Sequence, residues 1–236
     1  MPLWSRWDRL RRRLAAPSAP AVPTDAPSET ALRARLNADP NDVAAFATLA
    51  EVVRTRAHDS AERPAYPRRA RSADPGREAD DAVWALAEEL AHSPRAWFPL
   101  IEMARLSIDD DRGGAMRRLG TAAERDPSGE ALVEGVAMLR RAGHPTDALN
   151  LGVGHWRPRE HTPAVGRHLV EAALETGRAP EARRHLAALA GREDAAELRG
   201  LLEELEQQIK RVDRGRTIDL RTANEQVGEG RPGRDR

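Results

Sequence analysis

Apolar residues recur at three- and four-residue spacing along most of this chain, which is the pattern of helices that bury one face. From residue 79 onward the periodic segments are separated by short turns that contain Gly and Pro, such as "AGHP" and "TGRAP". We expect helices over residues 29–38, 41–57, 79–92, 95–108, 112–125, 128–142, 145–155, 163–177, 179–190 and 193–211. The pattern therefore predicts an all-α fold.

The segments outside this pattern divide the chain into parts. Residues 1–16 are basic, and residues 17–28 contain four prolines, which favour an extended linker. Residues 58–78 are polar and interrupted by prolines, so we expect a disordered insertion there. Residues 212–236 are rich in Gly and Arg and predict a flexible tail, which leaves a helical domain over residues 29–211.

Small residues recur in the helical domain with a period of about 34 residues. In the second helix of each unit stand Ala82, Ala115, Ala148 and Ala182, followed four places later by Leu86, Leu119, Gly152 and Leu186. In the first helix stand Ala50, Ala104, Ala137 and Ala173, each ten places after Pro40, Pro94, Pro127 or Pro163 and four places after Phe46, Leu100, Val133 or Leu169. A small residue lets two helices approach closely, and the larger apolar residue one turn earlier fills the groove beside it.

This helix–turn–helix period resembles the tetratricopeptide repeat (TPR) family over residues 29–191. Pro94 and Pro127 match the closing proline of the repeat, whereas the family's aromatic positions are mostly empty and the third unit departs from the pattern at "GVGHWRPREHTP". The resemblance implies antiparallel helix pairs stacked into a right-handed α-solenoid with flexible termini. It also implies a concave groove that binds a partner peptide or helix. The alternative is an irregular helical bundle whose periodicity is accidental.

The family often holds a peptide carboxylate with Lys and Asn, but this chain does not support that clamp. Lys210 is the only lysine and lies outside the repeats, and the only Asn residues within them are Asn37, Asn41 and Asn150. We therefore expect a non-enzymatic interaction scaffold whose protein or peptide partner the sequence does not identify.

Composition narrows the function classes. The 38 basic and 38 acidic residues balance, so no nucleic-acid partner is expected. The chain has no Cys, which excludes disulfides and thiolate chemistry. No segment is apolar enough for a membrane span or a signal peptide, and we expect a cytoplasmic protein.

No motif predicts catalysis, a cofactor or a metal site. Asp109, Asp110 and Asp111 lack the alternation and the closing Glu of a calcium loop. His155, His161 and His168 are spaced by six and seven residues, whereas two ligands on one helix face need a spacing of four. With no convincing nucleophile, we expect no enzyme.

The segment "MPLWSRWDRLRRRLAA" predicts a short basic amphipathic helix. Leu3, Trp7, Leu10 and Leu14 fall at helical spacing beside Trp4. The remaining faces carry Arg6, Arg9, Arg11, Arg12 and Arg13. The candidate docking residues are Trp4, Trp7, Leu10, Arg11, Arg12 and Arg13. Three roles stay open: packing on the protein's own helices, docking on a partner, or recruitment of an accessory protein to an anionic inner membrane surface.

The membrane role predicts that the chain cosediments with anionic vesicles and that deletion of residues 1–16 abolishes this. The reason is that the Trp side chains would enter the interface while the Arg side chains contact lipid phosphates. Vesicle sedimentation of both chains measures the effect. Equal sedimentation of the two would contradict the membrane role.

Overall fold

The computed structural model of this protein describes residues 27–62 and 75–229, which form ten helices and no strand. This confirms the all-helical fold class. The helices are α2 (Glu29–Ala38), α3 (Val43–Glu62), α4 (Pro75–Ala91), α5 (Phe98–Ser107), α6 (Arg112–Arg125), α7 (Glu130–Arg141), α8 (Pro145–His155), α9 (Pro163–Glu175), α10 (Ala179–Ala190) and α11 (Arg199–Glu229).

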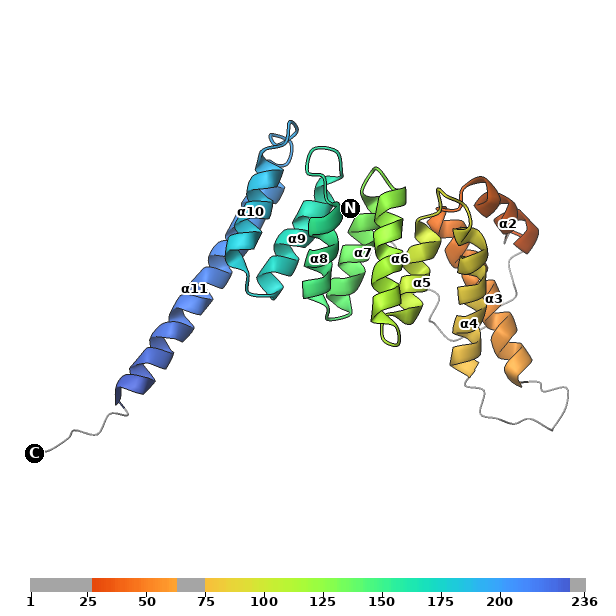
Figure 1. The fold of residues 1–236 in the computed structure, drawn as a ribbon, viewed down its shortest axis with the longest axis horizontal. Helices are drawn as coiled ribbons and strands as arrows, with labels where there is room; N and C mark the ends of the chain where they lie inside the picture. The colour runs from red at the N-terminus through yellow and green to blue at the C-terminus, as the bar shows by residue number, and fades with distance from the viewer. Residues whose placement is uncertain (1–26, 63–74, 230–236) are drawn as a thin grey trace, which may run out of the picture.

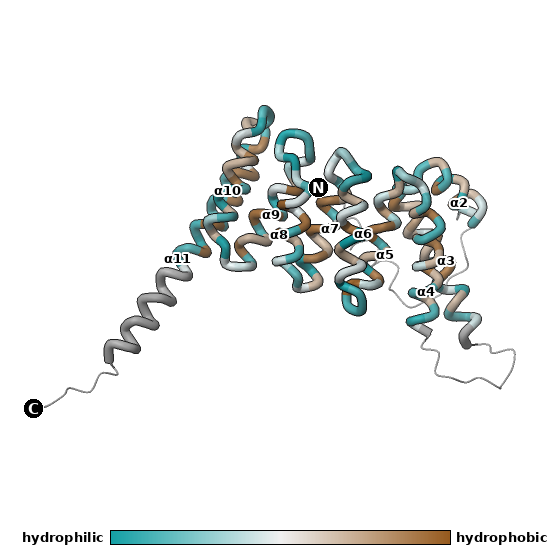
Figure 2. Tube along the Cα trace, viewed as in Figure 1, coloured by the Kyte–Doolittle hydropathy of each residue, from teal (hydrophilic) through white to brown (hydrophobic). Residues whose placement is uncertain are grey.

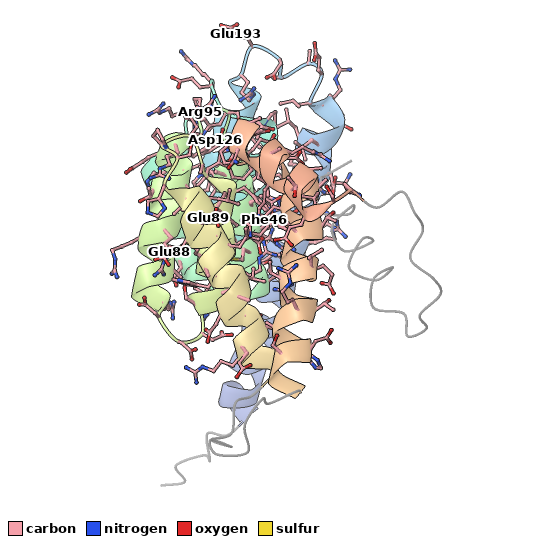
Figure 3. All side chains as sticks on the ribbon, turned by 90° about the vertical axis from the view of Figure 1, so that its right-hand side faces the viewer. Phe46, Glu88, Glu89, Arg95, Asp126 and Glu193 are labelled. Carbon is pink, nitrogen blue, oxygen red and sulfur yellow. The ribbon has the colours of Figure 1, made fainter. Side chains whose placement is uncertain are left out.

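The helices pack in sequence order as an elongated array (Figure 1). Four hairpins, α3–α4, α5–α6, α7–α8 and α9–α10, follow one another. Because α7 also contacts α5 and α9, and α6 contacts α8, the first helices of the hairpins form one layer and the second helices another. Figure 3, seen along the array, shows α3 in orange and α4 in yellow side by side at the near end.

Two glycines end the first helix of their hairpins in the same way. Gly143 and Gly177 have φ of 78° and 72°, a left-handed conformation that glycine adopts without strain. The amide of His144 donates to the carbonyl of Leu139 at 2.8 Å, and that of Arg178 donates to Ala173 at 2.7 Å. Both turns are therefore Schellman caps, at equivalent positions of successive repeats.

Arginine side chains close two of the loops between hairpins. Nη1 of Arg125, at the end of α6, donates to the carbonyls of Ala91, Ser93 and Ala96 at 2.9, 3.1 and 3.0 Å. In the loop after α10, Nη1 of Arg192 donates to the carbonyl of His161 at 2.8 Å and to that of Pro158. Each guanidinium satisfies loop carbonyls of the preceding hairpin, which have no partner in a helix.

The predicted apolar positions of the first helices are all buried. They are Ala50, Ala104, Ala137, Ala173, Phe46, Leu100, Val133 and Leu169. In the second helices Ala115, Ala148 and Ala182 are fully buried, but Ala82 is partly exposed, and Val83 and Ala87 occupy the core in its place. The prediction for Ala82 was wrong by one residue, because the buried line of α4 runs through Val83 and Ala87.

The proposed equivalence of Ala137 and Ala173 was also wrong. The two Schellman caps put Leu139 and Ala173 at the same position, so the register between α7 and α9 follows the caps and not the prolines. Ala137 then corresponds to Glu171. Counting from the prolines gave the wrong register between α7 and α9. The reason is that the α8–α9 connection is longer than the proline spacing of the earlier units implies.

Both predicted irregular segments are shorter than expected. Helix α3 extends to Glu62 and α4 begins at Pro75, so the ends of the expected insertion 58–78 are helical. A proline is tolerated at the start of a helix, where its missing N–H has no intrahelical role. Residues 63–74 lie outside the described residues. Helix α11 continues to Glu229, so most of the expected flexible tail is helical instead.

Apolar residues are concentrated in the helices of the array, and polar residues dominate the loops (Figure 2). Phe46 of α3 and Phe98 of α5 pack edge to face at 5.3 Å, which joins the first two hairpins. At the two ends of the array, Leu32 and Leu36 of α2 and Leu205 and Ile209 of α11 join the same core.

Leu169 of α9 packs directly on the backbone of α8 at Gly152. A Cβ at Gly152 would lie 2.0 Å from Cδ2 and 3.0 Å from Cγ of Leu169. We predict that Gly152→Ala destabilises the fold by about 1–3 kcal/mol through overpacking. Gly154→Ala in the same helix, where a Cβ meets nothing within 4 Å, should instead be neutral or stabilise by up to about 1 kcal/mol. Urea unfolding of the two variants measures both effects, and equal effects would contradict the packing described.

Candidate functional site

The candidate site is a groove on the first-helix layer, between α7 and α9 and closed at one end by α11. Its volume is about 730 Å³. The lining residues are Glu130, Val133, Glu134, Ala137, Arg140, Arg141, Thr162, Pro163, Ala164, Arg167, His168, Glu171, Glu175 and Leu201. The lining of the groove thus combines apolar side chains with charged side chains of both signs.

Equivalent positions of two successive units form the two walls. In the register of the caps, Glu130, Glu134, Ala137 and Arg141 of α7 match Ala164, His168, Glu171 and Glu175 of α9 in that order, and both sets line the groove. The repeat itself therefore produces the groove, because each first helix directs the same face to the same side of the layer.

Arg140 of α7 is the centre of an ion-pair network across the groove. Its Nη1 lies 2.5 Å from a carboxylate oxygen of Glu171, and its Nη2 lies 2.5 Å from one of Glu175. Nη1 also lies 2.8 Å from Nδ1 of His168. Nδ1 of His168 in turn lies 3.3 Å from a carboxylate oxygen of Glu171, so the imidazole contacts both partners of the ion pair.

The carboxyl of Glu171 has a strongly lowered pKa. Burial alone would raise the pKa of its carboxyl, but the hydrogen bond with His168 and the charge of Arg140 outweigh burial and lower the pKa to about 2. Arg167 adds a further contact at 3.2 Å and reaches Glu204 of α11 at 3.0 Å. Side chains of three helices therefore share one network.

Arg140 shows the complementary shift. Burial lowers the pKa of its guanidinium, but the hydrogen bond to Glu175 and the charges of Glu171 and Glu175 outweigh that effect and raise the pKa. The side chains of Arg140 and Glu171 are only 16% and 18% exposed. A pair held this far from water depends on each partner, because either charge alone would be left desolvated.

A second hollow of about 490 Å³ adjoins the groove between α9 and α11. It is lined by Arg140, Glu171, Leu174, Glu175, Gln208, Arg211 and Val212. Arg140, Glu171 and Glu175 belong to both hollows, so the network forms the ridge between them.

The three histidines considered in the sequence lie on different elements. His155 ends α8 and bonds to the carbonyl of Leu151, whereas His168 belongs to the network. His161 lies in the α8–α9 loop, and burial lowers the pKa of its imidazole. Within residues 27–62 and 75–229, no group of three or more potential metal-ligating side chains is found.

Two other sequence candidates have structural roles. Asp111 caps α6 by accepting from the amide of Gly114 at 2.8 Å. The side chain of Asn41 accepts from the amides of Trp97 and Phe98 at 2.8 and 3.0 Å and so caps α5.

The candidate docking residues Trp4, Trp7, Leu10, Arg11, Arg12 and Arg13 lie outside the described residues. Among the helices that are described, none is long and apolar enough to cross a membrane.

Sequence reasoning missed the Arg140 network. The only local signal was the spacing of Arg167, Glu171 and Glu175 at four-residue intervals on one helix face. The contacts of Arg140 span 28 to 35 residues, and their partners cannot be identified before the register of α7 against α9 is known.

No protein-family model, curated protein or solved structure matches the chain.

The low pKa of Glu171 predicts a pH-dependent contribution to stability. A carboxyl whose pKa is lowered from 4.5 to about 2 stabilises the fold above pH 4.5 and loses this contribution as the pH falls toward 2. Glu171→Gln should therefore cost up to about 3 kcal/mol near pH 7 and progressively less below pH 4.5. Solvent at the edge of the site reduces this maximum.

Urea unfolding at several pH values between 2 and 7 measures the difference between the two proteins. Glu203→Gln, on the exposed side of α11, is the matched control and should show little difference at any pH. A constant penalty for Glu171→Gln across the whole range would contradict the assigned shift.

Proposed function

We propose that this protein is a non-enzymatic binding protein of the TPR-like type, whose helix pairs form a right-handed solenoid. Its groove between α7 and α9 holds an extended or helical segment of a partner protein. The observation that carries this proposal is the groove itself, whose walls are built from equivalent positions of successive repeats. Repeat proteins with stacked helix pairs commonly bind along such surfaces.

The arrangement of the hairpins supports the TPR-like assignment. Each hairpin is two antiparallel helices of 10 to 20 residues, and the Schellman caps recur at equivalent positions of two successive hairpins. The first helices contact one another along the array, as α5 contacts α7, α7 contacts α9 and α9 contacts α11. A period near 34 with this layering is the pattern of the family.

The chemistry of the groove favours binding over catalysis. His168, Glu171 and Arg140 satisfy one another, so none of these three groups is left poised to transfer a proton or attack a substrate. Val133, Ala137 and Leu201 offer apolar surface in the lining of the groove. We therefore infer a partner segment with an apolar stripe, flanked by charges that complement Glu130 and Arg167.

Site-specific photocrosslinking in the native cell tests the proposal. A p-benzoylphenylalanine at Glu134 faces the groove, whereas the same residue at Val153, which is 60% exposed on α8 of the other layer, is the matched control. We expect a discrete crosslinked partner from position 134 that is absent from position 153. The same products from both positions would contradict a groove-specific partner.

Affinity for the captured partner provides the second measurement. Ala137→Arg places a long side chain into the groove and should raise the dissociation constant at least about tenfold through steric exclusion. Val153→Arg adds the same charge to the other layer and should leave the affinity unchanged. Circular dichroism of both variants verifies that the array is intact.

A further inference from the structure

The groove between α7 and α9 combines apolar side chains with an acidic end. Val133 and Ala137 of α7 lie one turn apart in its lining, and Leu201 of α11 adds a third apolar side chain. Glu130 and Glu134 line the groove at the start of α7. An occupant that complements this lining carries an apolar stripe and has cations toward one end.

Glu130 is the residue of this acidic end that lacks a cation. Its carboxyl makes no ion pair with any residue that the structure describes, whereas at the other end of the groove Arg140 pairs with two carboxylates of α9. Burial and the charge of Asp126 raise the pKa of the Glu130 carboxyl. A cation beside Glu130 would supply the charge that this carboxyl lacks.

Helix α7 sets the length of the groove. Its lining residues run from Glu130 to Arg141, and these 12 residues extend about 18 Å at about 1.5 Å per residue. A helical occupant that follows the groove from end to end therefore also has about twelve residues.

Residues 3–14 of the same chain have this length and this pattern. A helix over them would have one apolar face, formed by Leu3, Trp7, Leu10 and Leu14. Four of its five arginines lie in its second half, at Arg9, Arg11, Arg12 and Arg13. Among the residues outside the described ranges, no other segment combines large apolar residues with helical spacing.

We propose that residues 3–14 bind in the groove of their own chain and exclude a partner segment until they leave it. The arginine-rich end lies beside Glu130, so the segment runs antiparallel to α7. The inference rests on the proposed function, because it assigns an internal competitor to the same groove. Of the three roles that the sequence leaves open for this segment, it selects packing on the protein's own helices.

The linker is long enough for this docking. Helix α2 packs on α3 at the end of the array, and α5 and α7 follow before the groove (Figure 1). Neighbouring helices lie up to about 10 Å apart, so the distance from α2 to the groove is about 35 Å. Residues 15–28 contain four prolines, and a Pro-rich chain of this length spans up to about 43 Å at about 3.1 Å per residue.

Photocrosslinking within the purified full-length chain tests the proposal. Trp7→p-benzoylphenylalanine keeps an aromatic group in the apolar stripe. Irradiation should produce a crosslink within one chain that peptide mass spectrometry maps to residues 130–141 or 163–175. Its yield should not change on tenfold dilution, because the reaction is intramolecular.

Two matched pairs of variants separate docking from chance contact. Leu10→Asp puts a carboxylate into the apolar stripe and should reduce the crosslink yield about tenfold, whereas Ser5→Asp on the opposite face should leave it unchanged. Glu130→Gln removes the unpaired carboxylate and should reduce the yield about threefold. Glu203→Gln on the exposed side of α11 should have no effect.

The length of the linker provides an independent test. Deletion of residues 19–24 leaves eight linker residues, which span only about 25 Å at about 3.1 Å per residue. This chain should lose the crosslink, because the segment no longer reaches the groove. A linker with the same six residues in a different order has its full length and should retain the crosslink.

Competition for the groove is measured in the native cell. Leu10→Asp should raise the yield of the partner captured by p-benzoylphenylalanine at position 134 several-fold, because the internal competitor then leaves the groove. Ser5→Asp should leave this yield unchanged. A captured yield that is the same in both variants would contradict the competition.

Three outcomes of the crosslinking in the purified chain would overturn the proposal. The first is a crosslink that maps elsewhere, survives the shortened linker or does not form. The second is a product that joins two chains and disappears on dilution, which would identify a second copy as the occupant. The third is a crosslink that forms only to lipid when phosphatidylglycerol vesicles are added, which would favour the membrane role.

The failure of this inference can be distinguished from the failure of the proposed function. Crosslinking within the purified chain requires no partner, and partner capture at position 134 requires no docked N-terminal segment. A captured partner without the internal crosslink would overturn only the docking of residues 3–14. The internal crosslink without a captured partner would overturn only the proposed function.

Discussion

The close approach of leucine side chains to glycine backbones sets the spacing of the array. A Cβ at Gly152 would meet Leu169, one at Gly166 would lie 2.6 Å from Cδ2 of Leu189, and one at Gly135 would lie 3.1 Å from Cδ2 of Leu151. These contacts join α8 to α9, α9 to α10 and α7 to α8. Because interiors pack at nearly crystalline density, an added methyl group at the tightest of them forces a leucine side chain or a helix to shift. The width of the α7–α9 groove depends on this spacing.

Arginine satisfies the polar groups that helix packing leaves unpaired. Arg125 and Arg192 bind loop carbonyls between hairpins, and their positions are about two repeats apart. Arg140 instead binds carboxylates across the groove. The planar guanidinium offers five donors in a fixed arrangement, which a lysine ammonium cannot reproduce. The near absence of lysine in this chain is therefore compatible with the geometry of its loops and of its groove.

The sequence predicted the helices best where capping signals mark both ends. Residues 112–125, 145–155 and 179–190 are helical with the expected bounds, because an Asp or a proline opens each of them. The C-terminal helix was missed beyond residue 211 because its Gly and Arg content resembles a tail. The sequence there shows little apolar spacing of three and four residues, and hydrophobic periodicity cannot detect a helix that lacks this pattern.

The register and the site required the three-dimensional structure. In the α8–α9 connection Trp156 packs near Gly166. This connection shifts the repeat register by two residues relative to the register counted from the prolines. No local signal in "GVGHWRPREHTP" indicates that shift. Once the Schellman caps fix the register, Arg140 faces Glu171 and Glu175, and the groove follows. The buried positions of the first helices, in contrast, could be predicted from residue size alone. A helix face that packs against helices of its own layer and of the other layer must carry small or apolar residues.

Two helices outside the four hairpins cap the ends of the array. In stacked repeats each unit buries the face that the previous unit exposes, so the terminal units need a cap with a polar outer side. Helix α2 supplies Leu32 and Leu36 at one end, and α11 supplies Leu205 and Ile209 at the other. Helix α11 also continues past the last hairpin (Figure 1) and closes the groove through Leu201. The helix that ends the repeat thus also forms one end of the surface on which a partner would bind.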